Sequence, residues 1–565
     1  MTTRSDISIF YAYFYDFEEA LDIWREKFNR TTGHLESWQV VCYTFSLIFF
    51  VSWLRKILSS EHSIADRLLR STHSTVRSLP WVRPKFKQII GLARAHFEEE
   101  IHKDDFLREF YKFLPERGLD SKDLQREARE YSTMGQSITP ASTMSAEENE
   151  TLRITQEITA MFLRNGSLKG IRKMEAEIVK MISSMLHAGH GSTGVVTNGN
   201  TESILLVLYG ARRRAASLAI EHPEVLLPAS AHPAFTHVAN LLKISIIRVP
   251  VDKDDKVDVL RLKRRISSST ALIVVSAPNH STGTMDDVSR VAKISSQYNV
   301  PLHVDSSLGG FLLPFLELAD IHYPHIDFRL AGVTSMALDI DGHGKCPQKA
   351  SALIFRDEAW IKCHTFIDTK NRIGIYTART LHSFRDPATI SSAWATLLST
   401  GRDGYVDSTS MIVETCRKLI ELLKEIKEIE ILGSPDLCLV SFTTNIVDVY
   451  ALGEKLIDED WKLEIGANCL RLPITLELYE KNRIQTFVAD LEDAISALLI
   501  DTTYASESKT AALHRMIEST MDHWLVEEML RAKLLAEHST PAPIERTHLR
   551  SISIDGRKMS TIIEK

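Results

Sequence analysis

The sequence predicts an α/β protein with a mostly parallel sheet, followed by a smaller α+β domain and preceded by one N-terminal transmembrane helix. Between about residues 150 and 365, apolar runs alternate with amphipathic helical patterns; the runs are VLLPA, ISIIRVPV, TALIVVSAP, VPLHVD and SALIF. This alternation is typical of parallel strands joined by crossover helices. After about residue 400, we expect a helix over 408–428, strands near 429–450, and helices at 453–461 and near 482–500.

The composition is that of an ordinary globular protein and excludes several classes of function. The chain has 565 residues, 44% hydrophobic and 25% charged, with a net charge of −7. No clustered basic face accompanies this balance, so there is no basis for nucleic-acid binding. The six cysteines are scattered without a CxxC pair, which argues against a disulfide framework or a metal site.

The uncharged segment 37–54, SWQVVCYTFSLIFFVSWL, predicts a single membrane-spanning helix. Eighteen helical residues span about 27 Å, which suits the thin bilayer of the endoplasmic reticulum. Trp lies at both ends and Arg55 and Lys56 follow, so the positive-inside rule places residues 1–36 in the lumen and the main domain in the cytosol. The alternative is a buried core helix. With a lumenal N-terminus, Asn29 in Asn-Arg-Thr is a candidate glycosylation site.

The remaining boundaries follow from breakers and composition. We expect a helical stalk over 55–125, broken at Pro80 and Pro84, and a large domain over 126–380. A capping-box-like sequence at Ser145 predicts a helix start within it. A small domain over 381–500 then precedes a C-terminal helix and tail over 501–565. Beyond about residue 535 the chain is short of aromatics, which predicts a mobile tail.

Three motifs carry chemistry-bearing residues. Val333–Phe355 reads as a strand, a polar Gly-rich loop and a second strand. Upstream, the apolar strand 301–305 ends in the carboxylate Asp305. Earlier still, the stretch TNGNTES over 197–203 opens into a helical pattern.

These motifs, in this order and spacing, resemble the pyridoxal phosphate (PLP) enzymes of the aspartate-aminotransferase fold, and in particular the sphingosine-1-phosphate lyase family. The resemblance covers about residues 125–500 and implies the PLP-dependent transferase fold type I. It also implies PLP as cofactor, a phosphorylated sphingoid base as substrate, and a long-chain aldehyde and phosphoethanolamine as products. Sites of this fold lie at a subunit interface, so a homodimer is expected, and a membrane anchor fits the family.

The resemblance assigns cofactor-binding roles to residues of each motif. Asp305 would keep the pyridine nitrogen protonated, and His232 in Ser-Ala-His-Pro-Ala-Phe would stack on the ring. The phosphate would lie at a helix N-terminus formed by Gly199, Asn200 and Thr201. Each residue also has a structural interpretation: Asp305 and Thr201 as helix caps, and His232 as a turn residue.

The sequence departs from the lyase pattern where the chemistry would occur. Asp339, Gly344 and Pro347 match the family loop, but the position of its Schiff-base lysine is Gly342. Asn200 stands where the family's phosphate loop has glycine. The loop 383–388, which in the family completes the site across the dimer, keeps only Arg385. The substrate segment, aligned with 162–169, loses a His and an Asp.

No residue is therefore predicted as catalytic, and we expect an impaired or inactive pseudoenzyme that acts by binding. It would pair with itself or with an active paralogue as a heterodimer. One alternative is an active lyase with a relocated lysine, Lys345 or Lys349, although a misplacement of about an ångström already costs about 100-fold in rate. Another is a PLP-dependent amino-acid decarboxylase, which shares the lysine problem.

Overall fold

The computed structural model describes residues 79–80, 82–101, 146–165, 168–370, 372–381, 386–480, 483–501 and 523–539, the short strands 552–554 and 557–559, and a few isolated positions. The chain forms two compact units. One comprises Met1–Phe113 with Met521–Lys565, and the other Leu114–Thr520. Asn29, Arg385 and most of 37–54 lie outside the described residues.

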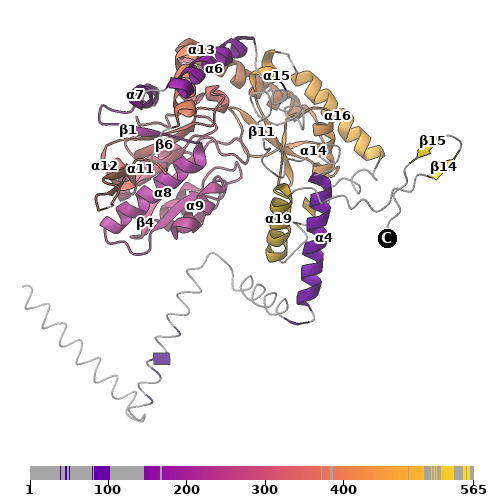
Figure 1. The fold of residues 1–565 in the computed structure, drawn as a ribbon, viewed down its shortest axis with the longest axis horizontal. Helices are drawn as coiled ribbons and strands as arrows, with labels where there is room; N and C mark the ends of the chain where they lie inside the picture. Colours follow the sequence, from indigo (N-terminus) through magenta and orange to yellow (C-terminus); the bar gives the residue numbers. More distant parts are fainter. Residues whose placement is uncertain are drawn as a thin grey trace, which may run out of the picture. The chain divides into compact units, whose positions relative to one another are not determined.

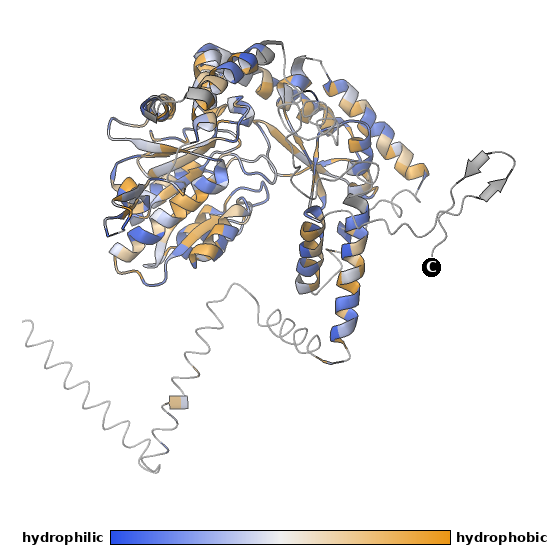
Figure 2. Cartoon of the chain, viewed as in Figure 1, coloured by the Kyte–Doolittle hydropathy of each residue, from blue (hydrophilic) through white to orange (hydrophobic). Residues whose placement is uncertain are grey.

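The first unit contains two packed helices, α4 (Arg83–Ile101) and α19 (His523–Glu537). Figure 2 shows hydrophobic and hydrophilic residues mixed along both, as expected of helices that bury one face. The rings of Phe86 and Trp524 meet edge to face, with centroids 6.1 Å apart. Pro84 does not break this region as predicted: it lies in the first turn of α4, where a missing N–H costs no hydrogen bond.

Two further expectations concern the membrane and the C-terminal region. Among the residues that the structure describes, no helix combines the length and the apolar character needed to cross a bilayer. Within the region predicted to be a mobile tail, α19 continues to Glu537 and strands β14 (Ile552–Ile554) and β15 (Arg557–Met559) form an antiparallel pair. An isolated two-stranded pair is at best marginally stable, so the mobile tail stays a prediction.

The second unit is built around a seven-stranded sheet with the order β1-β7-β6-β5-β4-β2-β3. Figure 1 labels β1, β4 and β6 of this sheet and the helices α8, α9, α11 and α12 near it. Strands β2 to β6 pair in parallel, whereas β7 is antiparallel to both β6 and β1. The predicted strands are confirmed, and the sheet is mostly parallel. Their bounds are β1 Thr193–Thr197, β2 Glu224–Pro228, β3 Ser245–Val249, β4 Thr270–Ser276, β5 Leu302–Asp305, β6 Val333–Asp339 and β7 Ser351–Phe355.

Alternating residues of each strand enter two separate cores, one on each face of the sheet. On β5 and β6, Val304 and Leu338 enter the first core, whereas Ala337 enters the second. This arrangement explains the continuous apolar runs, since both faces are covered. The first core is covered mainly by α7 (Leu168–Met185), α11 (Val288–Tyr298) and the start of α13 (Pro387–Glu425), and the second by α8 (Asn200–Ser217), α9 (Ala234–Leu242) and α12 (Ala359–His364).

Two helix boundaries differ from the prediction. The helix expected over 408–428 is part of α13, which consists of two helices that meet at a kink: the backbone at Gly401 is not helical, with φ +63° and ψ 177°. The second helix starts before residue 408 and ends at Glu425. The helix expected at 453–461 begins at Val449, because the Asp448 side chain accepts hydrogen bonds from Tyr450 N and Ala451 N and caps it. The start of α6 (Ala146–Asn165) directly after Ser145 agrees with the prediction.

The smaller α+β part has its own core and an antiparallel sheet with the order β10-β11-β13-β12. Its helices supply apolar side chains such as Leu456 and Phe487 to that core. The remaining bounds are β10 Glu430–Ile431, β11 Leu439–Thr443, β12 Glu464–Gly466, β13 Cys469–Pro473, α14 Val449–Asp458, α15 Leu476–Glu480, α16 Ile484–Ile500, α10 Val259–Arg265, a hairpin of β8 Phe366–Asp368 and β9 Tyr376–Ala378, and short 3₁₀ turns η3 Leu313–Phe315, η4 Glu317–Ala319 and η5 Gly342–Gly344.

Candidate cofactor site

Strands β5 and β6 bring two carboxylates to the same edge of the sheet. Asp305 is the last residue of β5 and pairs in register with Ala337 of β6. Asp339 ends β6 two residues later, so its side chain leaves the same face as that of Ala337. That face is covered by α8 and α9. Both carboxyl groups therefore lie at the carboxyl edge of a parallel sheet, where ligands bind in such folds.

Asp305 is only 1% exposed, yet one of its oxygens has no partner. Its Oδ1 accepts hydrogen bonds from the Ser307 hydroxyl at 2.8 Å and the Ser307 amide at 3.2 Å. The Asn200 side-chain amide donates to the same oxygen at 3.4 Å. No hydrogen bond reaches Oδ2 among the described residues. Because an unpaired buried carboxylate oxygen is costly, Oδ2 is suited to accept a hydrogen bond from a ligand, such as a protonated ring nitrogen.

Two histidines lie beside this carboxylate. The rings of His232 and His280 meet edge to face with centroids 4.9 Å apart. Nδ1 of His232 accepts a hydrogen bond from Ala234 N at 3.2 Å, so His232 is at once the predicted turn residue and a neighbour of the site. His280 Nε2 lies 2.9 Å from the Ser307 hydroxyl, which also donates to Asp305. Burial lowers the pKa of His280, which favours the neutral ring.

The predicted phosphate-binding end is the N-terminus of α8. Gly199 precedes the helix with φ +105°, and no side chain caps its first turn. Thr201 therefore does not act as the cap that its structural interpretation requires. The backbone amides of this turn are suited to an anion. Glu202 holds the loop before α8 in place: its carboxylate accepts hydrogen bonds from Asn198 N at 2.8 Å and from Leu381 N at 3.1 Å.

The loop that bears the lysine in the family holds no amine at the matching position. Gly342 is exposed, has φ +64°, and a Cβ added there would meet nothing within 4 Å. Lys345 lies at the end of the same turn, also with φ +64°. Lys349 points outward: its side chain is 86% exposed and its Nζ lies 3.8 Å from Asp341. From the other side, the Tyr405 hydroxyl donates to Gly344 O at 2.9 Å and fixes the loop against α13.

Asp339 lies in an environment that disfavours its charged form. Burial is the main cause that raises its pKa to about 8, the neighbouring Asp341 adds to this, and a hydrogen bond from the Ser351 hydroxyl opposes it. The pKa of Asp341 is also raised, mainly by burial, with Lys349 acting in the opposite direction. The edge of the sheet next to Gly342 thus gathers carboxyl groups.

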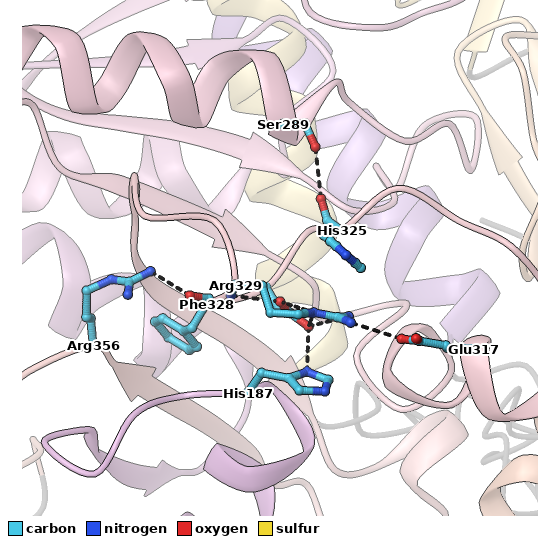
Figure 3. Close-up of polar contacts among 8 residues, drawn as sticks. His187, Ser289, Glu317, His325, Phe328, Arg329 and Arg356 are labelled. Atoms are coloured by element: carbon cyan, nitrogen blue, oxygen red, sulfur yellow. Dashed lines mark hydrogen bonds and ion pairs between the residues drawn. The ribbon is translucent and has the colours of Figure 1, made fainter.

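A second polar cluster lies apart from this site (Figure 3). Arg329 pairs with Asp327 and Glu317, each at 2.9 Å, and His187 Nδ1 lies 2.9 Å from Asp327. Burial opposes ionisation of Asp327, but hydrogen bonds from Arg329 and His187 bring its pKa below the ordinary value. The cluster lies at a cavity of about 680 Å³ between α7, η3 and α13, which none of the predicted cofactor residues lines. Its charges are mutually compensated, so we assign it a structural role.

The residues present fit PLP without its covalent link. Asp305 matches a pyridinium nitrogen, and the uncapped start of α8 matches a phosphate. His232 contacts His280, which lies against Ser307 beside Asp305. When bound, PLP supplies an electron sink, but Gly342 supplies no amine to hold it. The fold and site therefore define a protein of the PLP-dependent decarboxylase class.

Comparisons with known proteins narrow this class to one family. The pyridoxal-dependent decarboxylase conserved domain matches residues 153–445. Sphingosine-1-phosphate lyase 1 of Mus musculus is 30% identical over 538 residues, which cover 91% of this chain and 94% of that protein. The sphingosine-1-phosphate lyase of Drosophila melanogaster is 28% identical, covering 92% and 97%. The chain belongs to the sphingosine-1-phosphate lyase family.

Solved structures agree with this assignment. A sphingosine-1-phosphate lyase of Burkholderia pseudomallei superimposes with a TM-score of 0.65 and 28% identity, covering 73% of this chain and 98% of that one. A glutamate decarboxylase of Lactobacillus brevis, with a TM-score of 0.59 and 20% identity, shares the fold. The matched domain is pyridoxal-dependent, so the cofactor indicated for this chain is PLP.

The sequence predicted Asp305 as a site residue but not all of the residues that contact it. Asp305, Asn200 and His232 are gathered on one face of the sheet as predicted, although their roles toward a cofactor stay predictions. His280 and Ser307 were missed. The only available signal was their position directly after strands β4 and β5, which are neighbours in the sheet.

Proposed function

We propose that this chain is a sphingosine-1-phosphate lyase-like protein of sphingolipid metabolism that has lost the family's covalent chemistry and acts by binding. The observation that carries the proposal is Gly342, which stands where the family has its Schiff-base lysine. The surrounding loop is anchored by Tyr405. Without an amine at this position, the pocket holds PLP through Asp305 and the start of α8 alone.

Loss at this single position is local rather than a consequence of a collapsed site. A Cβ at Gly342 would meet no neighbour within 4 Å, so packing does not require glycine there, although the φ of +64° favours it. The buried Asp305 retains its hydrogen bonds from Ser307. Binding residues are kept where they are part of the fold, and the residue that performs the chemistry is missing.

The proposal is tested by assaying the full-length chain, in detergent, for release of long-chain aldehyde from a phosphorylated sphingoid base in the presence of PLP. We expect no turnover above that of a heat-denatured sample. Because Lys345 lies three positions from Gly342 on the same turn, an active lyase with a relocated lysine is the second candidate. Turnover that disappears in Lys345→Ala but survives in Lys349→Ala would establish that candidate instead. Release of CO₂ from amino acids would favour the decarboxylase alternative.

We also propose that the chain assembles as a homodimer, or as a heterodimer with an active relative. The supporting observation is a cluster of exposed apolar side chains on the β8–β9 hairpin, including Ile367, Ile373 and Ile375, which are 63%, 97% and 78% exposed. Exposed apolar clusters of this kind mark interaction surfaces. Light scattering should give twice the mass of the chain, and Ile375→Asp should shift it toward the monomer. A monomer in the unmodified chain would contradict the proposal.

An N-terminal anchor in the endoplasmic reticulum membrane completes the proposal. Among the few described residues of segment 37–54, Tyr43, Phe45 and Phe50 have helical backbone and are 63%, 69% and 53% exposed, as suits side chains that face lipid. Extraction of membranes with alkaline carbonate should leave the chain in the pellet. Glycosidase treatment should reduce its mass only if Asn29 is present, since a lumenal N-terminus exposes this sequon. Release of the chain by carbonate would contradict the anchor.

A further inference from the structure

The edge of the sheet beside Gly342 has an excess of negative groups. Asp305, Asp339 and Asp341 lie close enough that Asp339 is affected by the charges of the other two. Asp305 and Asp339 are on the face covered by α8; Asp305 is buried and Asp339 is partly buried. In a lyase with a lysine at this position, its amine would enter the same space. Here the position contributes only a hydrogen atom.

The Lys349 side chain does not fill this space. Lys349 contacts Asp341 from the solvent side, with its side chain 86% exposed. The Asp339 carboxyl accepts a hydrogen bond from the neutral hydroxyl of Ser351. A cation placed beside Asp339 would therefore gain a carboxylate partner in a partly buried setting, where such interactions are stronger than in water.

Two independent observations indicate that a ligand belongs here. The space above Gly342 is open, because nothing lies within 4 Å of an added Cβ. In addition, Oδ2 of Asp305 is unpartnered among the described residues although the residue is 1% exposed. A ring nitrogen at Asp305 and a cation toward Asp339 would satisfy both groups at once. The separate start of α8, with no side-chain cap, is suited to a phosphate.

Building on the non-covalent pocket proposed above, we propose that this site selects the amine form of the cofactor, pyridoxamine phosphate, over forms without an amine. The aminomethyl group of pyridoxamine phosphate brings its own ammonium to the place that the lysine amine has left. The aldehyde of PLP carries no charge, and glycine at position 342 offers no amine for it to react with. The ligand class is thus a phosphorylated pyridine that carries a primary amine, and Asp339 is the specificity-determining residue.

The test compares two ligands that differ only at the group in question. The full-length chain in detergent is dialysed against pyridoxamine phosphate or 4-deoxypyridoxine phosphate, in which a methyl group replaces the aminomethyl group and no covalent adduct can form. Ring fluorescence measures the bound fraction. We expect pyridoxamine phosphate to bind about tenfold more tightly, equivalent to about 1.4 kcal/mol.

Three variants distinguish a role of Asp339 in the ligand preference from a general loss of ligand binding. Asp339→Asn should remove most of the preference while leaving the affinity for the deoxy ligand within about twofold, and Asp339→Glu should retain the preference. Gly342→Lys should abolish the preference, because the new ammonium occupies the same space. Equal affinity of the unmodified chain for both ligands, or a preference that survives in Asp339→Asn, would overturn the inference and leave the proposed function standing. Failure of both ligands to bind would overturn the non-covalent pocket as well.

Discussion

Gly310 follows strand β5 and Gly342 follows strand β6, but the two glycines are constrained by different forces. Gly310 follows β5 in a buried turn, where an added Cβ would collide with Leu338 and approach Ser306 O to 2.7 Å. Gly342 is exposed on η5, and an added Cβ there would touch nothing. The first glycine is required by packing, and the second is not. The comparison shows that the scaffold and the chemistry of this site are encoded by separate residues, so one can be lost without the other.

The largest loss of stability is expected from a substitution at Gly310. Gly310→Ala forces a methyl group against Leu338 and the backbone of Ser306, and we expect a cost near the upper end of the overpacking range, about 3 kcal/mol in the free energy of unfolding. Urea denaturation followed by circular dichroism measures the change. A loss of less than about 1 kcal/mol would show that the turn after β5 is less constrained than the distances indicate.

The pH dependence of the free energy of unfolding tests whether the pKa of Asp339 is raised in the folded chain. The pKa of Asp339 is raised to about 8 and that of Asp286 to about 7, both mainly by burial. An unfolded Asp has a pKa of about 3.9, so the folded chain holds protons that the unfolded chain releases. The stability that these two groups contribute is complete below about pH 4 and is lost as the pH rises through 7 and 8, by up to about 1.4 kcal/mol per pH unit for each.

Asp339→Asn should therefore roughly halve the part of that slope due to these two groups between about pH 4 and 7. Urea midpoints measured at several pH values in that window test it. An unchanged slope in the variant would show that Asp339 titrates normally in the folded chain.

At Gly342 the expected effect on stability is smaller. Gly342→Ala must adopt a positive φ, which costs about 1–2 kcal/mol, but it encounters no steric clash. The same denaturation experiment that is applied to Gly310→Ala gives a direct comparison. If the two variants lose equal stability, the proposed separation between scaffold and chemistry is wrong.

The smallest effect concerns Asn200, which competes for the key carboxylate. Its amide donates to Asp305 at 3.4 Å, a long hydrogen bond. Removing it in Asn200→Ala leaves Oδ1 of Asp305 with its two hydrogen bonds from Ser307 and makes the carboxylate a stronger acceptor for a ligand at Oδ2. This should strengthen binding of pyridoxamine phosphate by roughly two- to fivefold, as expected for one weak hydrogen bond. Dialysis measures the change. Weaker binding in the variant would show that Asn200 contacts the ligand instead of competing with it.

The sequence allowed the sheet to be predicted because burial on both faces leaves long apolar runs. Asp305 could be placed at the ligand-binding edge because it ends one of these runs. The contact between His280 and Ser307 could not be predicted, since it depends on which strands are neighbours. The pattern also could not show which helices pack against α13, which kinks at Gly401. Its contacts with α6, α7, α15 and α16 join segments that are far apart in the chain.

The role of Asn200 illustrates a further limit. From the sequence, it is a departure from a glycine in a phosphate loop. In the structure its side chain turns toward Asp305, so it affects the ring end of the pocket and not only the phosphate end. The direction of a side chain at the first position of a helix depends on its surroundings, which a motif does not specify.

The most direct test of the central claim is the intact mass of the full-length chain after incubation with PLP and reduction with borohydride. We predict no added mass at a residue of the site in the unmodified chain. The Gly342→Lys variant should gain one reduced pyridoxyl group, carried by the introduced amine. A single pyridoxyl group mapped to Lys345 or Lys349 in the unmodified chain would contradict the account, because it would show that the covalent link has moved within the loop and has not been lost.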